Sequence, residues 1–120
     1  MAKFRELFTT SGKKVLLGKS AENNEELVRQ VEPTEIVLHT AMPGSPFANI
    51  KGEATKKDVK EAGIFCARFS QDWRDNKRDV IVHVFRGKNI HKDKGMKTGT
   101  FGVKKFEVIK VKKEDILRLS

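Results

Sequence analysis

The sequence predicts a single domain over residues 1–120 of the α+β (mixed α/β) class, with one mixed sheet of about five to seven strands and two main helices. Three observations predict this fold. A chain of 120 residues has the length of one domain with one core. Several short segments are rich in Val, Ile and Phe, and two longer segments carry apolar residues at helical spacing. Their order, β-β-α-β-β-α-β-β, is typical of a sheet covered by helices.

The first three elements are a hairpin and a helix. Residues 3–9 and 14–18 are the predicted strands, and Gly12 permits the turn between them. Ser20 is a suitable N-cap for a helix over residues 21–31, and Pro33 ends that helix.

Two strands follow, over residues 35–40 and 47–52. The first is apolar on both faces, which predicts a place inside the sheet. The segment Pro43–Pro46 between them admits two readings. Gly44 permits positive φ and the prolines fix their own φ, so the segment is a rigid turn. Alternatively, the N–H groups of Gly44 and Ser45, with the Ser45 hydroxyl and His39 at the strand end, form a concave anion site.

The second half begins with a capping box, Thr55 and Asp58, and a long helix over residues 56–77. Cys66 and Trp73 lie on its apolar stripe and are predicted to be core rather than ligands. A central strand over residues 79–87 and a polar loop over 88–100 come next. The strand over 101–111 changes phase near Lys104 and Lys105, which indicates a bulge or turn.

Three further expectations concern the apolar residues near the C-terminus. Phe101 and Phe106 alternate with valines and are predicted to be core, although exposed aromatics in a basic region are typical of RNA binding. The last eight residues are predicted to form a helical turn that docks through Leu117 and Leu119.

Charge is unevenly distributed along the chain. The net charge is +9, and residues 84–113 alone contain 10 Lys/Arg and 2 Asp/Glu, a net charge of +8. Such a regional excess indicates a polyanionic partner, and nucleic acid is the first candidate. A solvated, lysine-rich surface that maintains solubility has the same composition, so both readings stay open.

Several function classes find no support in the sequence. No apolar run approaches the ~18 residues of a membrane span, and the N-terminus lacks the apolar region of a signal peptide. The single cysteine, Cys66, favours a reducing cytoplasm. One Cys and three His without paired spacing match no common zinc pattern, and no nucleotide-binding glycine motif is present. His39, His83 and His91 lack a local catalytic signature, so we expect no enzyme, metal or cofactor.

Four segments in order resemble one family. The stretches "FRELFTTSGKKVLLGKSAENNEELV", "EIVLHTAMPGSPFANIK", "EAGIFCARFSQDW" and "KGMKTGTFGVKKFEVIKV" are similar to successive parts of the NFACT-R domain, the RNA-binding portion of the NFACT ribosome quality-control proteins. His39, Pro43, Gly44 and Ser45 fall on its signature, as do Gly18, Lys19 and Asn24. Pro46 stands where the family commonly has a second histidine. The chain resembles the free-standing versions of this domain.

The resemblance implies a non-catalytic, cytoplasmic RNA-binding protein that contacts tRNA or ribosomal RNA, with the large ribosomal subunit as a further expected partner. It places one part of the RNA surface on the Pro43–Pro46 loop, and we add phosphate contacts from the basic C-terminal third. The expected RNA-binding residues are Lys19, His39, Pro43, Gly44, Ser45, Lys51, Arg86, Lys88, Lys104 and Lys105.

Two alternatives remain from other classes. In one, the domain is an enzyme or accessory subunit of RNA modification, with His39 and Ser45 near the reaction centre. In the other, it is an adaptor that docks on a ribosomal protein.

Overall fold

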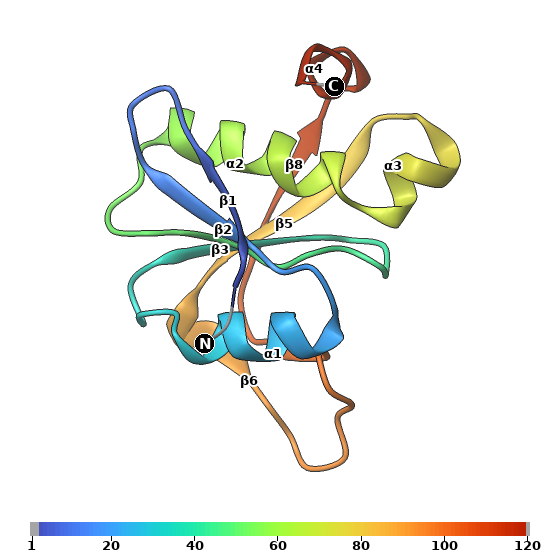
Figure 1. Ribbon diagram of the computed structural model, residues 1–120. Coiled ribbons are helices and arrows are strands. Elements are labelled where there is room, and N and C mark those ends of the chain that lie inside the picture. The colour runs from blue at the N-terminus through green and yellow to red at the C-terminus, as the bar shows by residue number, and fades with distance from the viewer. Residues whose placement is uncertain (1–2, 120) are drawn as a thin grey trace.

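A six-stranded sheet with strand order β1-β2-β4-β3-β5-β8 forms the centre of the fold (Figure 1). The computed structural model describes residues 3–119. Every neighbouring pair in the sheet is antiparallel, whereas the sequence suggested a mixed sheet. The strands are β1 Arg5–Phe8, β2 Lys14–Leu17, β3 Ile36–Thr40, β4 Ala48–Ile50, β5 Val80–Arg86 and β8 Glu107–Val111.

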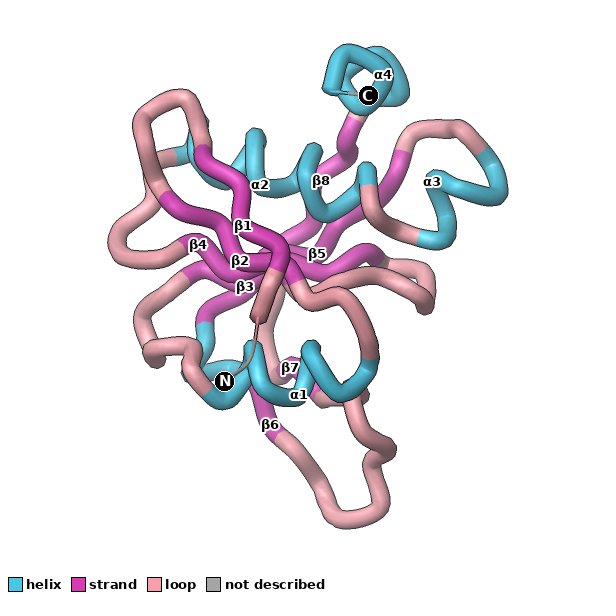
Figure 2. The backbone as a smooth tube through the Cα atoms, viewed as in Figure 1, coloured by secondary structure: helices cyan, strands magenta, loops and turns pink. Residues whose placement is uncertain are grey.

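Helices cover the two faces of the sheet in separate groups. Helix α1 (Ala21–Arg29) lies on one face, and α2 (Lys56–Arg68) and α3 (Gln71–Asn76) lie on the other (Figure 1). Helix α4 (Lys113–Leu119) follows β8 and packs beside α2. A two-stranded ribbon of β6 (Ile90–His91) and β7 (Gly102–Val103) lies on the side of α1 (Figure 2). None of the helices within residues 3–119 has the length and hydropathy required to span a bilayer.

The alternation of side chains along the strands divides the core in two. On the α2 face, Val80, Val82 and Val84 of β5 pack with Cys66 and Trp73, as expected from the helical stripe. On the α1 face, Leu27 packs with Val37, Phe47 and Phe85, which come from three different strand regions. The sheet is therefore enclosed on both sides over its central strands.

Most sequence-predicted elements are confirmed. The hairpin of β1 and β2 turns at Gly12, whose φ is 91°. Ser20 caps α1, and Thr55 with Asp58 forms the predicted capping box of α2. Strands β3 and β5 are internal. The predicted strand over residues 101–111 is interrupted by a bend at Lys104 and Lys105, which separates β7 from β8.

Three expectations require correction. The predicted helix over residues 56–77 is two helices, because the Ser70 hydroxyl accepts a hydrogen bond from the Trp73 N–H and starts a new helix. Leu117 and Leu119 are exposed, and Ile116 is the residue of α4 that is buried. Phe106 is 46% exposed rather than core, whereas Phe101 packs at the edge of the α1-side cluster.

The carboxylate of Asp58 joins the first hairpin to α2. Its Oδ1 accepts a hydrogen bond from the Ser11 hydroxyl at 2.6 Å, and its Oδ2 accepts one from the Thr55 N–H at 3.0 Å. The Ser11 bond, followed by the bond from Thr55, holds the pKa of Asp58 well below its usual range. The side chain therefore stabilises the fold in its ionised form.

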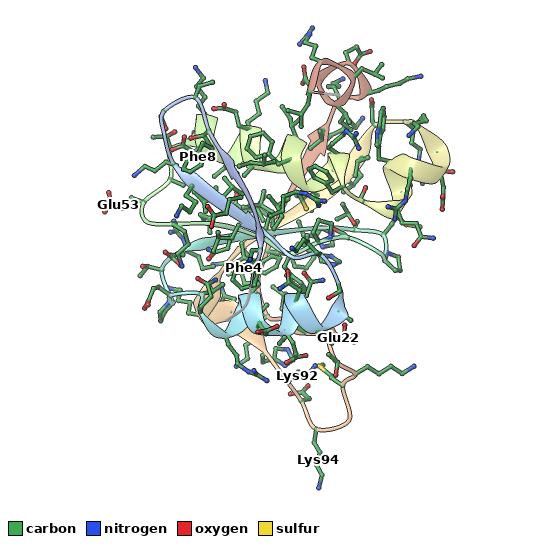
Figure 3. All side chains as sticks on the ribbon, in the orientation of Figure 1. Phe4, Phe8, Glu22, Glu53, Lys92 and Lys94 are labelled. Carbon is green, nitrogen blue, oxygen red and sulfur yellow. The ribbon has the colours of Figure 1, made fainter. Side chains whose placement is uncertain are left out.

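We expect Asp58→Asn to lower the free energy of unfolding at neutral pH, because an amide nitrogen cannot accept the Thr55 hydrogen bond. The depressed pKa means that this stabilisation is complete above the ordinary Asp pKa of about 3.9 and is lost as pH falls below it. Urea denaturation should therefore show a gap between the wild type and the variant that narrows from pH 5 to pH 2.5. Glu53→Gln is the control, since Glu53 points into solvent (Figure 3). A gap independent of pH would contradict this role.

Candidate nucleic-acid interface

A cleft of about 850 Å³ lies at the end of the sheet where β3 turns into β4. The start of α1, the Pro43–Pro46 loop, α3 and the segment 98–103 contribute to its walls. In Figure 2 the loop between β3 and β4 lies on the same side of the molecule as α3 and the start of α1. The floor includes side chains of β3 and β5, so segments far apart in the sequence meet here.

The charges around the cleft have one sign. Arg5, Lys19 and Arg74 line it, and none of the described residues in its lining is Asp or Glu. Lys19 and Arg74 are exposed, and their side chains make no hydrogen bond or ion pair within residues 3–119. The Arg5 guanidinium lies 3.9 Å from the ring centroid of Phe69. Unneutralised cations in a concave site attract anions more strongly than the same cations on a flat surface.

The Pro43–Pro46 loop is a fixed structural turn. The Ser45 hydroxyl accepts a hydrogen bond from the Thr40 N–H at 3.2 Å and donates one to the Pro46 carbonyl at 2.8 Å. Ser45 is only 7% exposed, so the structure corrects the expectation that its hydroxyl is offered to a ligand. The Gly44 carbonyl accepts a hydrogen bond from the Gln71 N–H, which ties the loop to α3.

The backbone N–H of Gly44 is available to hydrogen-bond a ligand. Gly44 has φ of +83° and lies too close to Gln71 for a Cβ, which explains the glycine. It is exposed in the cleft lining, and within residues 3–119 nothing accepts a hydrogen bond from its N–H. One half of the anion-site reading, a free amide at this turn, is therefore available.

Asn24 fixes the wall that carries Lys19. Its Oδ1 accepts a hydrogen bond from the Phe47 N–H at 3.1 Å, and the Gly18 N–H donates to the Phe47 carbonyl at 3.1 Å. A Cβ on Gly18 would lie 1.8 Å from that same Asn24 oxygen. Gly18 and Asn24 therefore act as a pair that fixes the segment carrying Lys19.

The opposite wall, residues 98–103, is hydrogen-bonded to α1 through the carboxylate of Glu25. Glu25 Oε1 accepts hydrogen bonds from Lys92 Nζ at 2.8 Å and from the Gly99 N–H at 2.7 Å. The Lys92 hydrogen bond is the main cause of a lowered pKa at Glu25. Lys92 is thereby neutralised, in contrast to the cations of the cleft.

Two histidines on adjacent strands contribute neutral rings. His39 and His83 are paired in the β3–β5 register. Burial lowers the pKa of His39, against the opposing effect of its backbone hydrogen bond to Thr40, and burial also lowers the pKa of His83. Both imidazoles are therefore uncharged at pH 7. The His39 ring lies 4.5 Å from that of Phe47.

The other predicted RNA-binding residues lie outside the cleft. Lys51 Nζ is 2.8 Å from both Glu35 Oε1 and Gln30 Oε1, so its charge is used within the fold. Arg86 donates to the Thr34 carbonyl and lines a second groove, beside α2. Lys88, Lys104 and Lys105 are exposed, and the last two directly precede Phe106, which does line the cleft.

Sequence reasoning missed Arg5 and Arg74. Neither stands in a basic run or beside a turn motif. They reach the cleft because β1 is an edge strand and because the chain turns back at Ser70, so the sheet order and the helix break were needed to find them.

Comparison with known proteins decides the family. The profile described as the NFACT protein RNA binding domain matches residues 3–105. The chain belongs to this family. No curated protein matches it in sequence.

A solved structure shows that the NFACT RNA-binding domain fold extends to distant sequences. The C-terminal part of the fibronectin/fibrinogen-binding protein from Streptococcus suis superimposes with a TM-score of 0.85 at 21% identity. The match covers 98% of this chain and 49% of the other, so this chain spans about half of that structure.

Within residues 3–119, no group of three or more His, Cys, Asp or Glu is arranged to hold a metal ion.

We expect Asn24→Ala to destabilise the protein by about 1–3 kcal/mol, because the buried Phe47 N–H loses its acceptor. Gly18→Ala should also destabilise it, since the new methyl group displaces the Asn24 amide. The double variant should cost less than the sum of the two, because both changes remove the same bond. Denaturant melts of the three variants, with the exposed α1 residue Glu26→Ala as control, measure this. Additive losses would show that Gly18 and Asn24 act independently.

Proposed function

We propose that this NFACT RNA-binding domain binds RNA in the cleft and that binding, rather than catalysis, is its role. The observation that carries the proposal is the composition of the cleft lining. It contains Arg5, Lys19 and Arg74, and none of its described residues is Asp or Glu. RNA presents a regular series of phosphates to such a site. The membership of the family supports RNA over other polyanions.

The RNA that we propose is tRNA or ribosomal RNA. The function would then lie in translation or ribosome quality control in the cytoplasm, with contact to the large ribosomal subunit. The resemblance of four ordered segments to the NFACT-R domain supports this choice.

The state of the candidate nucleophiles supports a binding role. The Ser45 hydroxyl donates to the Pro46 carbonyl, and His39 Nδ1 lies 2.7 Å from the Thr40 carbonyl, so the two side chains do not form a nucleophile–base pair. Burial raises the pKa of Cys66 to about 12, which leaves its thiol protonated and unreactive. An activity on RNA that His39→Ala abolishes without unfolding would favour the enzyme alternative.

The exposed lysines at 88, 104 and 105 extend the proposed surface beyond the cleft. Lys104 and Lys105 are separated from the cleft lining by no more than one residue, because Phe106 belongs to it. We propose that they contact phosphates of the same RNA strand as it leaves the cleft.

Removing cleft cations should weaken RNA binding and reduce its dependence on salt. In fluorescence anisotropy with tRNA from 50 to 300 mM KCl, Lys19→Ala and Arg74→Ala should each reduce the slope of log K against log [salt] by about 0.7 for single strands or about 0.9 for duplex. The double variant Lys104→Ala/Lys105→Ala should flatten the slope further. Lys57→Ala is the matched control, because Lys57 is an exposed lysine at the start of α2, at the other end of the sheet from α3 (Figure 1).

The outcome that contradicts the proposal is equally definite. If the cleft variants retain the slope of the wild type and Lys57→Ala reduces it, the interface lies on the α2 side. If the protein binds neither tRNA nor ribosomal RNA at 50 mM salt, RNA binding itself is excluded. Binding to ribosomes that persists after nuclease treatment and at high salt would favour the protein adaptor instead.

A further inference from the structure

Among residues 3–119, α1 is the only α-helix on its face of the sheet (Figure 1). There Leu27 packs with Val37 of β3 and Phe85 of β5, and this cluster does not include the edge strand β8, which leaves the β8 edge of the face open. Three apolar side chains are exposed near this open region: Ile81 is 37% exposed, Phe106 is 46% exposed and Val108 is 57% exposed. In the β5–β8 register Val108 is paired with His83, which lines the cleft.

Phe106 is held in a defined orientation despite its exposure. Its ring stacks on the imidazole of His83, with centroids 4.1 Å apart and planes inclined by 24°. His83 is fixed in turn by its place in the internal strand β5, opposite His39. One face of the Phe106 ring is thus supported by a neutral ring, and the residue still leaves nearly half of its surface open.

Resting on the proposed function, we propose that Phe106, backed by His83, is a stacking platform for an unpaired RNA base. The site then selects single-stranded or looped RNA, because the bases of a duplex are stacked on one another and cannot offer a free face. Exposed Lys104 and Lys105 directly precede Phe106, and the cleft that Phe106 lines also contains the cleft cations. Phosphates on both sides of a base on Phe106 would then have basic residues to contact.

Charge complementarity favours this occupant over a protein segment. The Phe106 ring belongs to the lining of the cleft that holds the cations, and none of the described lining residues is Asp or Glu. Nucleic acid combines flat apolar faces with negative charge in every repeating unit, and aromatic side chains bind its bases without sequence preference. A second copy of this chain would bring its own net positive charge of +9 to the same surface.

The test compares a fluorescently labelled 12-nucleotide oligo(A) with a 12-base-pair RNA duplex, each titrated by anisotropy with the full chain. The wild type should prefer the single strand. Phe106→Ala and Phe106→Leu should weaken single-strand binding by about 5- to 160-fold, the range for loss of one aromatic–base stack. They should leave the salt slope unchanged, because no charge is removed. Phe106→Trp should restore the affinity, since it restores an aromatic face.

Phe8→Ala is the matched control. Phe8 is 57% exposed, lies at the end of the edge strand β1 (Figure 3) and makes no aromatic ring contact within residues 3–119. Its removal should leave both affinities unchanged. Melting temperatures of all variants, measured beside the titrations, identify any loss of folded protein.

The two proposals fail in different ways. Equal binding of duplex and single strand, with Phe106→Leu harmless and the salt slope still dependent on Lys19 and Arg74, would overturn the stacking platform and leave RNA binding in the cleft intact. Absence of binding to any RNA would overturn both. A change in oligomeric state on Phe106→Ala, seen by sedimentation without RNA and with RNA affinity unchanged, would assign the ring to self-association and overturn the platform.

Discussion

The position of Phe47 is the constraint on which the cleft depends. Its N–H donates to Asn24 Oδ1 and its carbonyl accepts from the Gly18 N–H, so both of its backbone polar groups are paired with the segment that leads into α1. Its ring contacts those of His39, Phe85 and Phe101, at centroid distances of 4.5, 6.5 and 5.5 Å. One residue therefore aligns β3, β5, the start of α1 and the wall at residue 101. Dense packing of this kind transmits any displacement to each of these elements.

The placement of carboxylates, together with the cations, defines the charge of the cleft, since none of its described lining residues is Asp or Glu. Elsewhere, some basic side chains have acidic partners: Lys51 pairs with Glu35, and Arg78 pairs with Asp72. Such pairs cancel much of the field that a polyanion would sense at a distance. The cleft cations lack partners of this kind within residues 3–119, so a modest number of charges acts together. The net charge of the whole chain affects solubility and the rate at which a polyanion approaches. The excess of positive charge in the cleft favours binding at that place.

The sequence was most informative where one local interaction decides the structure. Ser20, Gly12 and the Thr55–Asp58 pair each set an element boundary through a bond to a residue no more than four positions away, and all were predicted. Ser70 was missed because its neighbours continue the helical stripe in phase, although its hydroxyl begins α3. The sequence left the Ser45 hydroxyl open between the turn and a ligand, because its burial beside Cys66 depends on a contact across 21 residues. Arg74 became visible only through that same break at Ser70.

The wall formed by residues 98–103 is held unevenly. Phe101 packs on Phe47 and residues 102–103 pair with β6, whereas residues 98–100 are joined to α1 by the Lys92 and Gly99 bonds to one partly exposed carboxylate, Glu25. Segments with few anchors open far more often than the core, and they do so without global unfolding. Local opening of residues 98–100 would let an RNA strand enter the cleft from the side instead of end-first.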